Sequence, residues 1–248
     1  EPLIEYLPMI LRKCIVHLTK YLPVSLPLFR RVRKITNNLY NNQEDRLIGY
    51  FDWMKVNEIK NLFAHNKKLT LDQYDPHSYF KRLLSKLGSE KSLLQKMLFL
   101  EVNTFLVDHN LNYTDKMSMA EGVETRVPYL DLDVFEFAQK IPPSLKMRGN
   151  ETKYILKKLA ERYLSKEIIY RPKTGFGAPV RKWITEDMND MISKRLSEET
   201  IREQGVFSFK AIKQLLEKNK SGELDVSYNI WAILAIGSWL EQFQKNKK

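Results

Sequence analysis

The chain has 248 residues, of which 43% are hydrophobic and 29% charged, which is enough apolar material for one large domain or two small ones and argues against disorder. Its net charge of +11 is compatible with nucleic acid, an anionic membrane surface or a polyphosphate substrate as a partner. The single cysteine excludes an internal disulfide bond, and no stretch approaches the roughly 20 apolar residues that span a membrane, so we expect a cytoplasmic protein without a membrane span.

The first forty residues predict two basic helices. Residues 3–22 carry apolar side chains at helical spacing, with Pro8 splitting or starting the helix, and residues 30–40 form a second, shorter one. Cys14 lies among apolar neighbours and is interpreted as a small buried hydrophobic residue rather than a reactive thiol. The four histidines lack the spacing of zinc ligands, so we expect no metal site.

The middle of the chain continues the helical pattern. Residues 56–63 and 79–87 form predicted helices, and residues 93–110 are so nearly apolar that we expect a central helix. Thr114 is a suitable cap for a helix over 115–121, and Gly122 is suited to end it.

The last part of the chain also predicts helices. Residues 127–130 should be extended because Pro128 disfavours a helix before it, and Asp131 should cap a helix over 132–140. A hydrophobic staple and cap at residues 207–208 precede a helix over 209–218. Residues 228–243 are apolar on most faces, which indicates a central helix with its tryptophans in the core. Runs typical of strands are almost absent, so the fold class is mainly α.

The most informative stretch is residues 115–131, which crowds charges among small and thioether side chains. Glu124 and Arg126 are two residues apart, so in an extended segment both point to one side, opposite the β-branched residues that we expect to pack. This arrangement offers a carboxylate and a guanidinium to one cavity. The alternative is a buried ion pair that only fixes the loop.

Two further groups of basic residues have a phosphate-binding character. Lys173 lies in a loop stiffened by Pro172 and freed by two glycines, where it is either a point charge for a phosphate or a solvated turn residue. Arg148 and Lys153 precede a predicted helix over 152–164, whose N-terminus would help to bind a phosphate, or they form an ordinary polar helix entry.

Several linked segments resemble one family in order and spacing. The runs DKMSMAEGVETRVPYLD at 115–131, IPPSLKMRG at 141–149, TKYILKKL at 152–159 and RPKTGFGAPVRKWI at 171–184 resemble the C-terminal synthetase domain of glutamine-hydrolysing asparagine synthetases. The resemblance divides the chain into a variable helical insertion at 1–97, a motif region at 98–185 and C-terminal helices at 186–248, which we expect to form one compact unit. It implies the multi-helical C-terminal part of an adenine-nucleotide α-hydrolase-like (ATP pyrophosphatase) α/β domain.

The resemblance also implies an activity and a set of residues. In this family ATP adenylates the side-chain carboxylate of aspartate, and ammonia released from glutamine by a separate glutaminase domain then forms the amide. Lys173 matches the family lysine that neutralises phosphate charge, and Glu124 is the second catalytic candidate. Further positions that match the family at the substrate or phosphate side are Arg126, Asp115, Lys116, Arg148, Lys153 and Arg171.

Two family motifs are absent from the sequence. Neither the Ser-Gly-Gly-x-Asp-Ser pyrophosphatase loop nor the acidic segment that holds Mg²⁺ occurs in it. We therefore expect a C-terminal fragment that binds neither ATP nor Mg²⁺ tightly by itself and makes no asparagine alone, with a homodimer as one possible assembly.

Two other readings remain open beside the ligase fragment of the asparagine type. The chain is either a related ligase that acts on another carboxylate, or a basic helical module that binds nucleic acid or an anionic surface. The sequence lacks the interleaved aromatic and basic residues of nucleic-acid binders, so we expect no nucleic-acid partner.

Overall fold

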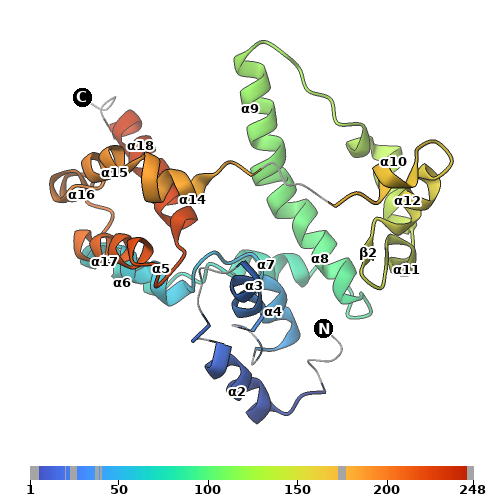
Figure 1. The fold of residues 1–248 in the computed structure, drawn as a ribbon, viewed down its shortest axis with the longest axis horizontal. Helices are drawn as coiled ribbons and strands as arrows, with labels where there is room; N and C mark the ends of the chain where they lie inside the picture. The colour runs from blue at the N-terminus through green and yellow to red at the C-terminus, as the bar shows by residue number, and fades with distance from the viewer. Residues whose placement is uncertain are drawn as a thin grey trace. The chain divides into compact units, whose positions relative to one another are not determined.

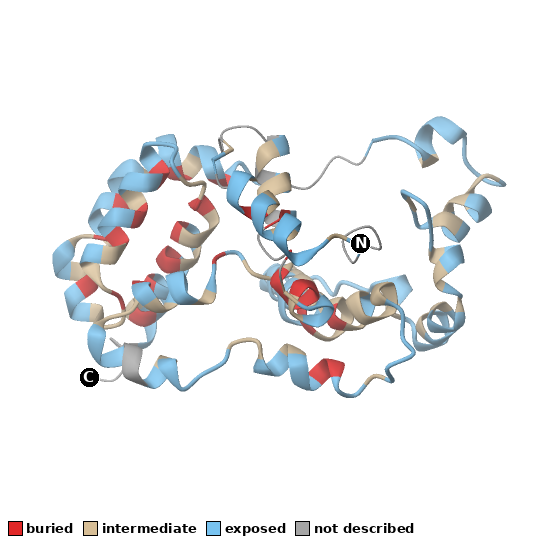
Figure 2. Ribbon diagram, turned by 90° about the horizontal axis from the view of Figure 1, so that it is seen from below, coloured by how far each residue is buried: buried red, intermediate tan, exposed pale blue. Residues whose placement is uncertain are grey.

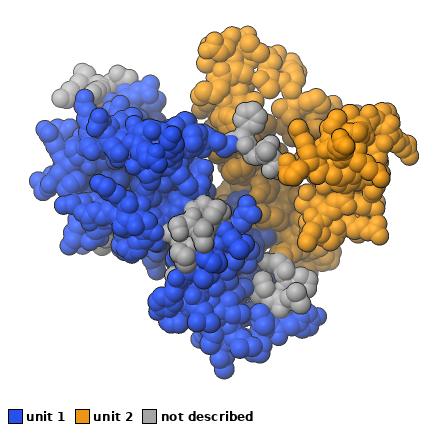
Figure 3. Space-filling view, in the orientation of Figure 1, with its two compact units in different colours: residues 1–78, 176–248 blue, residues 79–175 orange. Residues whose placement is uncertain are grey.

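The computed structural model describes residues 6–19, 21–22, 27–36, 39, 41–172 and 177–244. The described chain is mainly helical, as the sequence predicts (Figure 1). It divides into two compact units: unit 1 comprises Glu1–Ser78 and Phe176–Lys248, and unit 2 comprises Tyr79–Gly175 (Figure 3). The assignment to an ATP pyrophosphatase fold and the division at residues 97 and 185 stay predictions.

Unit 1 contains segments from both ends of the chain. The first are α2 (Met9–Thr19), α3 (Pro27–Thr36), α4 (Gln43–Gly49), α5 (Val56–Leu62) and α6 (His65–Asp72). The second are α14 (Val180–Lys182), the π-helix η3 (Trp183–Asp187), α15 (Asn189–Arg195), α16 (Glu198–Gln204), α17 (Phe209–Lys220) and α18 (Ser227–Gln244).

The core of unit 1 forms around one face of α18. Its buried residues recur at helical spacing, so they form one stripe that packs against α14 to α17: Ser227, Ile230, Ile233, Leu234, Gly237 and Leu240. The expectation of a central helix is therefore right for this stripe. It is wrong for the other side, because Trp231 is 39% exposed and Trp239 57% exposed.

Two backbone links join the early and late segments of unit 1. The Ala64 N–H donates to the Val206 carbonyl oxygen at 2.9 Å, and the Ser208 N–H donates to the Leu62 carbonyl oxygen at 2.8 Å. The rings of Phe63 and Phe207 lie between these links, 5.3 Å apart. The Ser208 hydroxyl also accepts from the Ala211 N–H, which confirms it as the cap of α17.

The first helix, α2, begins directly after Pro8 and packs on α3. The hydroxyl groups of Thr19 and Thr36 lie 2.8 Å apart and tie the two helices together. Val16 is the only residue that α2 buries, and Cys14 is exposed. The expectation of a buried cysteine is wrong, because it rested on apolar neighbours in sequence that themselves face outward.

Unit 2 contains one long helical run over residues 93–120. It consists of α8 (Leu93–Glu101), the π-helix η1 (Val102–Leu111) and α9 (Asn112–Ala120), which follow one another without a break (Figure 1). α7 (Ser78–Leu84) precedes it. Ser92 and Gln95 form a capping box at the start of α8. Because α9 continues η1, Thr114 lies inside a helix, and its predicted role as a cap is wrong.

The π-helix coincides with polar side chains inside an apolar run. The Asn103 amide donates to the Phe99 carbonyl oxygen at 2.8 Å, and the Thr104 hydroxyl donates to the Leu100 carbonyl oxygen at 2.7 Å. These bonds compete with backbone N–H groups for the same acceptors. Leu100 and Thr104 are buried, whereas Phe105 is 41% exposed, so the expectation of a central helix holds for one face only.

The rest of unit 2 consists of short elements. They are the 3₁₀ turn η2 (Pro128–Leu130), α10 (Leu132–Lys140), α11 (Pro143–Lys146), β1 (Met147–Arg148), β2 (Glu151–Thr152), α12 (Tyr154–Ala160) and α13 (Lys166–Ile169). Asp131 accepts from the N–H groups of Asp133 and Val134, which confirms it as the cap of α10. Val127 is extended as predicted, but residues 128–130 form a turn instead of an extended segment.

Burial differs sharply along the chain. From Phe105 to Pro172 and from Gly177 to Pro179, no residue is buried (Figure 2). Buried positions return at Val180, where the helices of the unit 1 core begin. Within the described ranges, no helix has the length and apolar character needed to cross a membrane.

Gly122 ends α9 with the hydrogen bonds of a Schellman motif. Its N–H donates to the Met119 carbonyl oxygen and the Val123 N–H donates to the Ser118 carbonyl oxygen, both at 3.0 Å, while Gly122 has φ of 68°. A side chain there would meet no atom within 4 Å, so only the left-handed backbone opposes it. We expect Gly122→Ala to lower the free energy of unfolding by about 1 kcal/mol.

Urea unfolding followed by circular dichroism measures this effect. Gly177→Ala is the matched control, because its added methyl group also meets nothing within 4 Å and the backbone is not left-handed. The control should keep wild-type stability. Equal stability of the two variants would show that the left-handed turn does not carry the effect.

Candidate functional site

Seven of the eight candidate residues lie in unit 2 and are described by the structure. They come from α9, the segment after it, the β1–β2 hairpin, the start of α12 and the end of α13: Asp115, Lys116, Glu124, Arg126, Arg148, Lys153 and Arg171. Lys173 lies outside the described residues. Proteins place binding residues on exposed loops more often than in the core, and this set follows that pattern.

Glu124 and Arg126 form an ion pair in the extended segment after Gly122. The Arg126 Nη2 lies 2.7 Å from the Glu124 Oε1, and their side chains are 83% and 66% exposed. The prediction that both point to one side is therefore confirmed, because they reach one another. The alternative of a buried pair is wrong, and so is the packed opposite side, since Val123 is 57% exposed.

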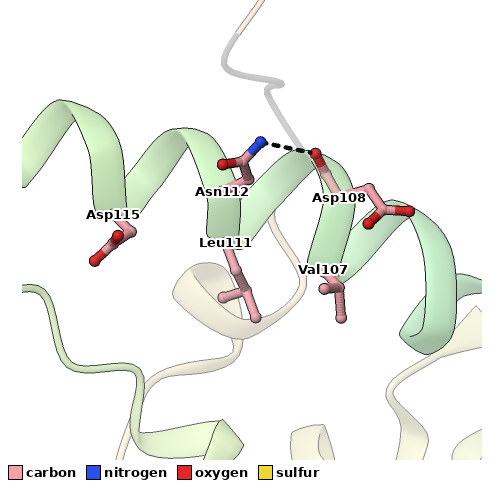
Figure 4. Close-up of a pocket in the computed structure, with 5 residues that line it drawn as sticks. All are labelled: Val107, Asp108, Leu111, Asn112 and Asp115. Atoms are coloured by element: carbon pink, nitrogen blue, oxygen red, sulfur yellow. Dashed lines mark hydrogen bonds between the residues drawn. The ribbon is translucent and has the colours of Figure 1, made fainter.

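Asp115 lines a hollow on the long helical run of unit 2. The hollow has a volume of about 540 Å³ and is open to solvent, and its lining residues come from η1 and α9: Val107, Asp108, Leu111, Asn112 and Asp115 (Figure 4). The Asn112 amide donates to the Asp108 carbonyl oxygen at 3.4 Å, which leaves the carboxylate of Asp108 on the surface. Lys116 follows Asp115 and is exposed.

Arg148 lies in a β-hairpin that the sequence analysis did not anticipate. Residues Arg148 and Glu151 pair across a two-residue turn in which Gly149 has φ of 59°. The guanidinium donates to the Tyr154 hydroxyl at 2.8 Å and lies 5.3 Å from the centre of its ring. These contacts orient Arg148 and leave most of its five N–H donors for a ligand.

Lys153 connects the hairpin to α12 in a left-handed conformation, with φ of 57°. Non-glycine residues take this conformation seldom, and it occurs most often in turns and at functional sites. α12 begins only at Tyr154, two residues later than predicted, and is a single short helix of 7 residues. Arg171 is exposed beyond the end of α13.

A cluster on α12 and α13 was missed by the sequence analysis. The Lys158 Nζ lies 2.7 Å from the Glu161 Oε1, and the Tyr170 hydroxyl donates to the same oxygen at 2.5 Å. The Lys158–Glu161 spacing is a helical signal that was available. Tyr170 is nine residues away, so only the fold reveals its contact with Glu161.

The same cluster shifts three pKa values. The salt-bridge hydrogen bond from Lys158 is the larger cause, and the Tyr170 hydroxyl the smaller, that lower the pKa of Glu161 below 4.5. Glu161 in turn raises the pKa of Lys158 and of Tyr170. A lowered carboxyl pKa stabilises the folded state above pH 4.5 and this contribution is lost as the pH falls through the folded value. The raised values act in the opposite sense, and their contributions are lost at alkaline pH.

Two variants test the order of these causes. Lys158→Met should raise the pKa of Glu161 toward 4.5, and Tyr170→Phe should raise it by less, since Lys158 is the larger cause. Carboxyl-carbon NMR titration measures both shifts. Tyr163→Phe is the control, because Tyr163 is 78% exposed and should leave the Glu161 pKa unchanged. A larger shift in Tyr170→Phe than in Lys158→Met would reverse this assignment.

The charges of this surface fit phosphate better than a metal ion. Arg148, Lys153 and Arg171 are exposed cations on successive elements of unit 2, which suits an anionic group. No group of three or more metal-ligating side chains occurs within the part of the chain that the structure describes. These residues therefore do not fit Mg²⁺, and no step through that ion is derived from them.

Comparison with known proteins finds one family across nearly the whole chain. The family model for asparagine synthase matches residues 17–241. No solved structure was found to match.

Relatives in curated collections cover the chain but are much longer. The glutamine-hydrolyzing asparagine synthetase 1 of Bacillus subtilis (strain 168) is 29% identical over 238 residues, which are 95% of this chain and 35% of the relative. Asparagine synthetase 3 of the same organism is 28% identical over 78% of this chain and 34% of its own length. Amidase chry2 of Gibberella zeae is 26% identical over 48% of this chain and 19% of its own length. The chain thus spans about a third of the length of the relatives it matches best.

Proposed function

Because this chain belongs to the asparagine synthase family, we propose that it forms one side of the active site of an ATP-dependent, amide-forming ligase. The observation that carries the proposal is the family match over residues 17–241, which includes every candidate site residue in one stretch. The proposed substrates are aspartate, ATP and ammonia derived from glutamine.

The proposed reaction has two steps. An oxygen of the aspartate side-chain carboxylate attacks the α-phosphorus of ATP, forms an acyl-adenylate and displaces pyrophosphate. Ammonia then attacks the acyl carbon, loses a proton, and AMP leaves with the oxygen that came from the carboxylate. Charge develops on phosphate oxygens in the first step and on the acyl oxygen in the second, so fixed positive charges assist both.

Residues of this chain take distinct roles in the proposal. Lys173 stabilises charge on the α-phosphate and pyrophosphate, and Arg126 binds the substrate carboxylate with its remaining N–H donors. Glu124 holds the Arg126 guanidinium at 2.7 Å and so fixes its orientation. Asp115 and Lys116 lie at the substrate side.

The phosphate side of the proposed site uses the remaining cations. Arg148 is oriented by Tyr154, and Lys153 and Arg171 lie exposed on the neighbouring elements. The pyrophosphatase loop and the acidic Mg²⁺-binding segment, which this sequence lacks, would come from another part of a complete enzyme. We propose that this chain alone binds ATP weakly and makes no asparagine.

A ligase that acts on another carboxylate is the second candidate. It is favoured by the similarity to Amidase chry2, which covers 48% of this chain. The candidate site does not discriminate between carboxylates, because a carboxylate–guanidinium pair recognises any of them.

Transfer of an isotope tests the proposed function. The chain is combined with the part of the Bacillus subtilis synthetase 1 that lies outside the match, and given ATP, Mg²⁺, ammonium and aspartate labelled with ¹⁸O in its side-chain carboxylate. The proposal expects asparagine and ¹⁸O-labelled AMP by mass spectrometry. Label in inorganic phosphate together with ADP would overturn it, because that result requires an acyl phosphate. Labelled AMP with another carboxylic acid and none with aspartate would select the second candidate.

A further inference from the structure

The segment from Phe105 to Pro172 is folded but has no core of its own. None of its residues is buried, although it contains α9 to α13 and most of η1. Isolated helices shorter than about 12–15 residues are marginal in water, because nucleation costs more than the few hydrogen bonds return. α10 has 9 residues and α12 has 7, so both need a packing partner to persist.

The helices of this segment have apolar faces suited to such a partner. On α10, Val134 and Phe137 lie one turn apart and are 43% and 68% exposed. On α12, Ile155 and Leu159 are likewise one turn apart and 39% and 50% exposed. Leu132, at the start of α10, is 75% exposed. Exposed apolar surface on this scale is typical of an interaction surface.

Unit 1 offers a direct contrast. Its helices α14 to α18 are of similar length, yet each α-helix among them from α14 to α17 buries at least one aliphatic side chain in a common core. The chain is therefore able to form a conventional core where its own sequence supplies both sides. In Phe105–Pro172 only one side is present.

We infer that the apolar surface of Phe105–Pro172 is the docking surface for the nucleotide-binding part of an asparagine synthase family polypeptide. This inference rests on the proposed function and names the partner of the same site. The first argument is length, because a relative that matches 95% of this chain has only 35% of its own length in the match. The relative thus holds ample additional chain to cover the surface.

The second argument is position. The uncovered segment contains Asp115, Glu124, Arg126, Arg148, Lys153 and Arg171, and these lie between or beside its exposed apolar residues. A partner seated on the apolar surface brings its own groups next to these charges. Removal of water by that contact also strengthens their interactions with an anionic substrate.

A binding experiment without substrates tests the inference. The full chain is mixed with the part of the Bacillus subtilis synthetase 1 outside the match, and the dissociation constant is measured by analytical ultracentrifugation. We expect a one-to-one complex. We expect Leu159→Glu to weaken it at least about tenfold, because a carboxylate on this surface must lose water without gaining a partner.

The matched control is Leu11→Glu on α2, because Leu11 is 49% exposed and Leu159 is 50% exposed. A second pair guards against misfolding: Leu132→Glu and its control Ile10→Glu replace residues that are both 75% exposed. The controls should bind like the wild type. The inference is overturned if no complex forms, if Leu159→Glu and Leu132→Glu bind as tightly as their controls, or if the chain instead forms a homodimer that Leu159→Glu dissociates.

Hydrogen exchange distinguishes a partner from cover by the chain itself. In the chain alone, amides of α10 and α12 should exchange much faster than those of α18, and the partner should slow them. Slow exchange without the partner would overturn the inference, because unit 1 or another copy would then cover the surface. These readouts need no catalysis, so a bound but inactive complex would refute the proposed function and leave the docking surface standing.

Discussion

Lys173→Ala is expected to reduce AMP formation by about 10²–10³-fold in the reconstituted enzyme, which corresponds to about 2.7–4 kcal/mol of transition-state stabilisation. The reason is that the proposed role of Lys173 is to place one positive charge where the leaving pyrophosphate becomes more negative. Such a charge acts more strongly in the transition state than in the ground state, so the loss should appear in kcat and in kcat/KM.

Initial rates of AMP release at several ATP concentrations measure this effect. Lys166→Ala is the control, because Lys166 is an exposed lysine of α13 in the same unit with no proposed role. It should keep at least about half of the wild-type rate. Equal rates in the two variants would remove Lys173 from the site and leave it as a solvated turn residue.

Ile230→Ala is expected to lower the free energy of unfolding by about 2–5 kcal/mol. Ile230 is 1% exposed and lies in the buried stripe of α18, where Ile212 of α17 is also fully buried. Removal of three carbon atoms there leaves a cavity that helices packed on all sides do not fill.

The comparison variant lies on the same helix. Ile236 is 42% exposed, so Ile236→Ala should cost less than about 1 kcal/mol. Urea unfolding followed by tryptophan fluorescence measures both changes. A similar loss in the two variants would mean that the stripe at Ser227, Ile230 and Ile233 is not the centre of the core.

Local features of the fold were predictable from sequence. The caps at Asp131 and Ser208 were found because a cap involves a side chain and an N–H group within three residues. The Schellman turn at Gly122 follows from the same locality. The mainly helical class follows from the scarcity of alternating β-branched residues.

Burial was predictable only where the chain supplies both packing surfaces. The buried stripe of α18 was found because the helices that cover it belong to the same chain. The same reasoning failed for Phe105, Trp239 and Cys14, which are apolar or soft residues with no cover. An apolar pattern states that a side chain favours burial, and a second surface must exist before it is buried.

The candidate site shows the same division between local and distant effects. Glu124 and Arg126 share a side because residues two apart always do in an extended segment. The contact between Tyr170 and Glu161 depends on how α13 returns to α12, which the sequence pattern does not contain. The β1–β2 hairpin was missed because strands of two residues have no alternating pattern to detect.

The most direct test compares the chain alone with the reconstituted complex. Each is incubated with ATP, Mg²⁺, aspartate and ammonium, and asparagine is measured by mass spectrometry. If this chain forms one side of the site, the chain alone yields no ATP-dependent asparagine and the complex does. ATP-dependent asparagine from the 248 residues alone would contradict the account.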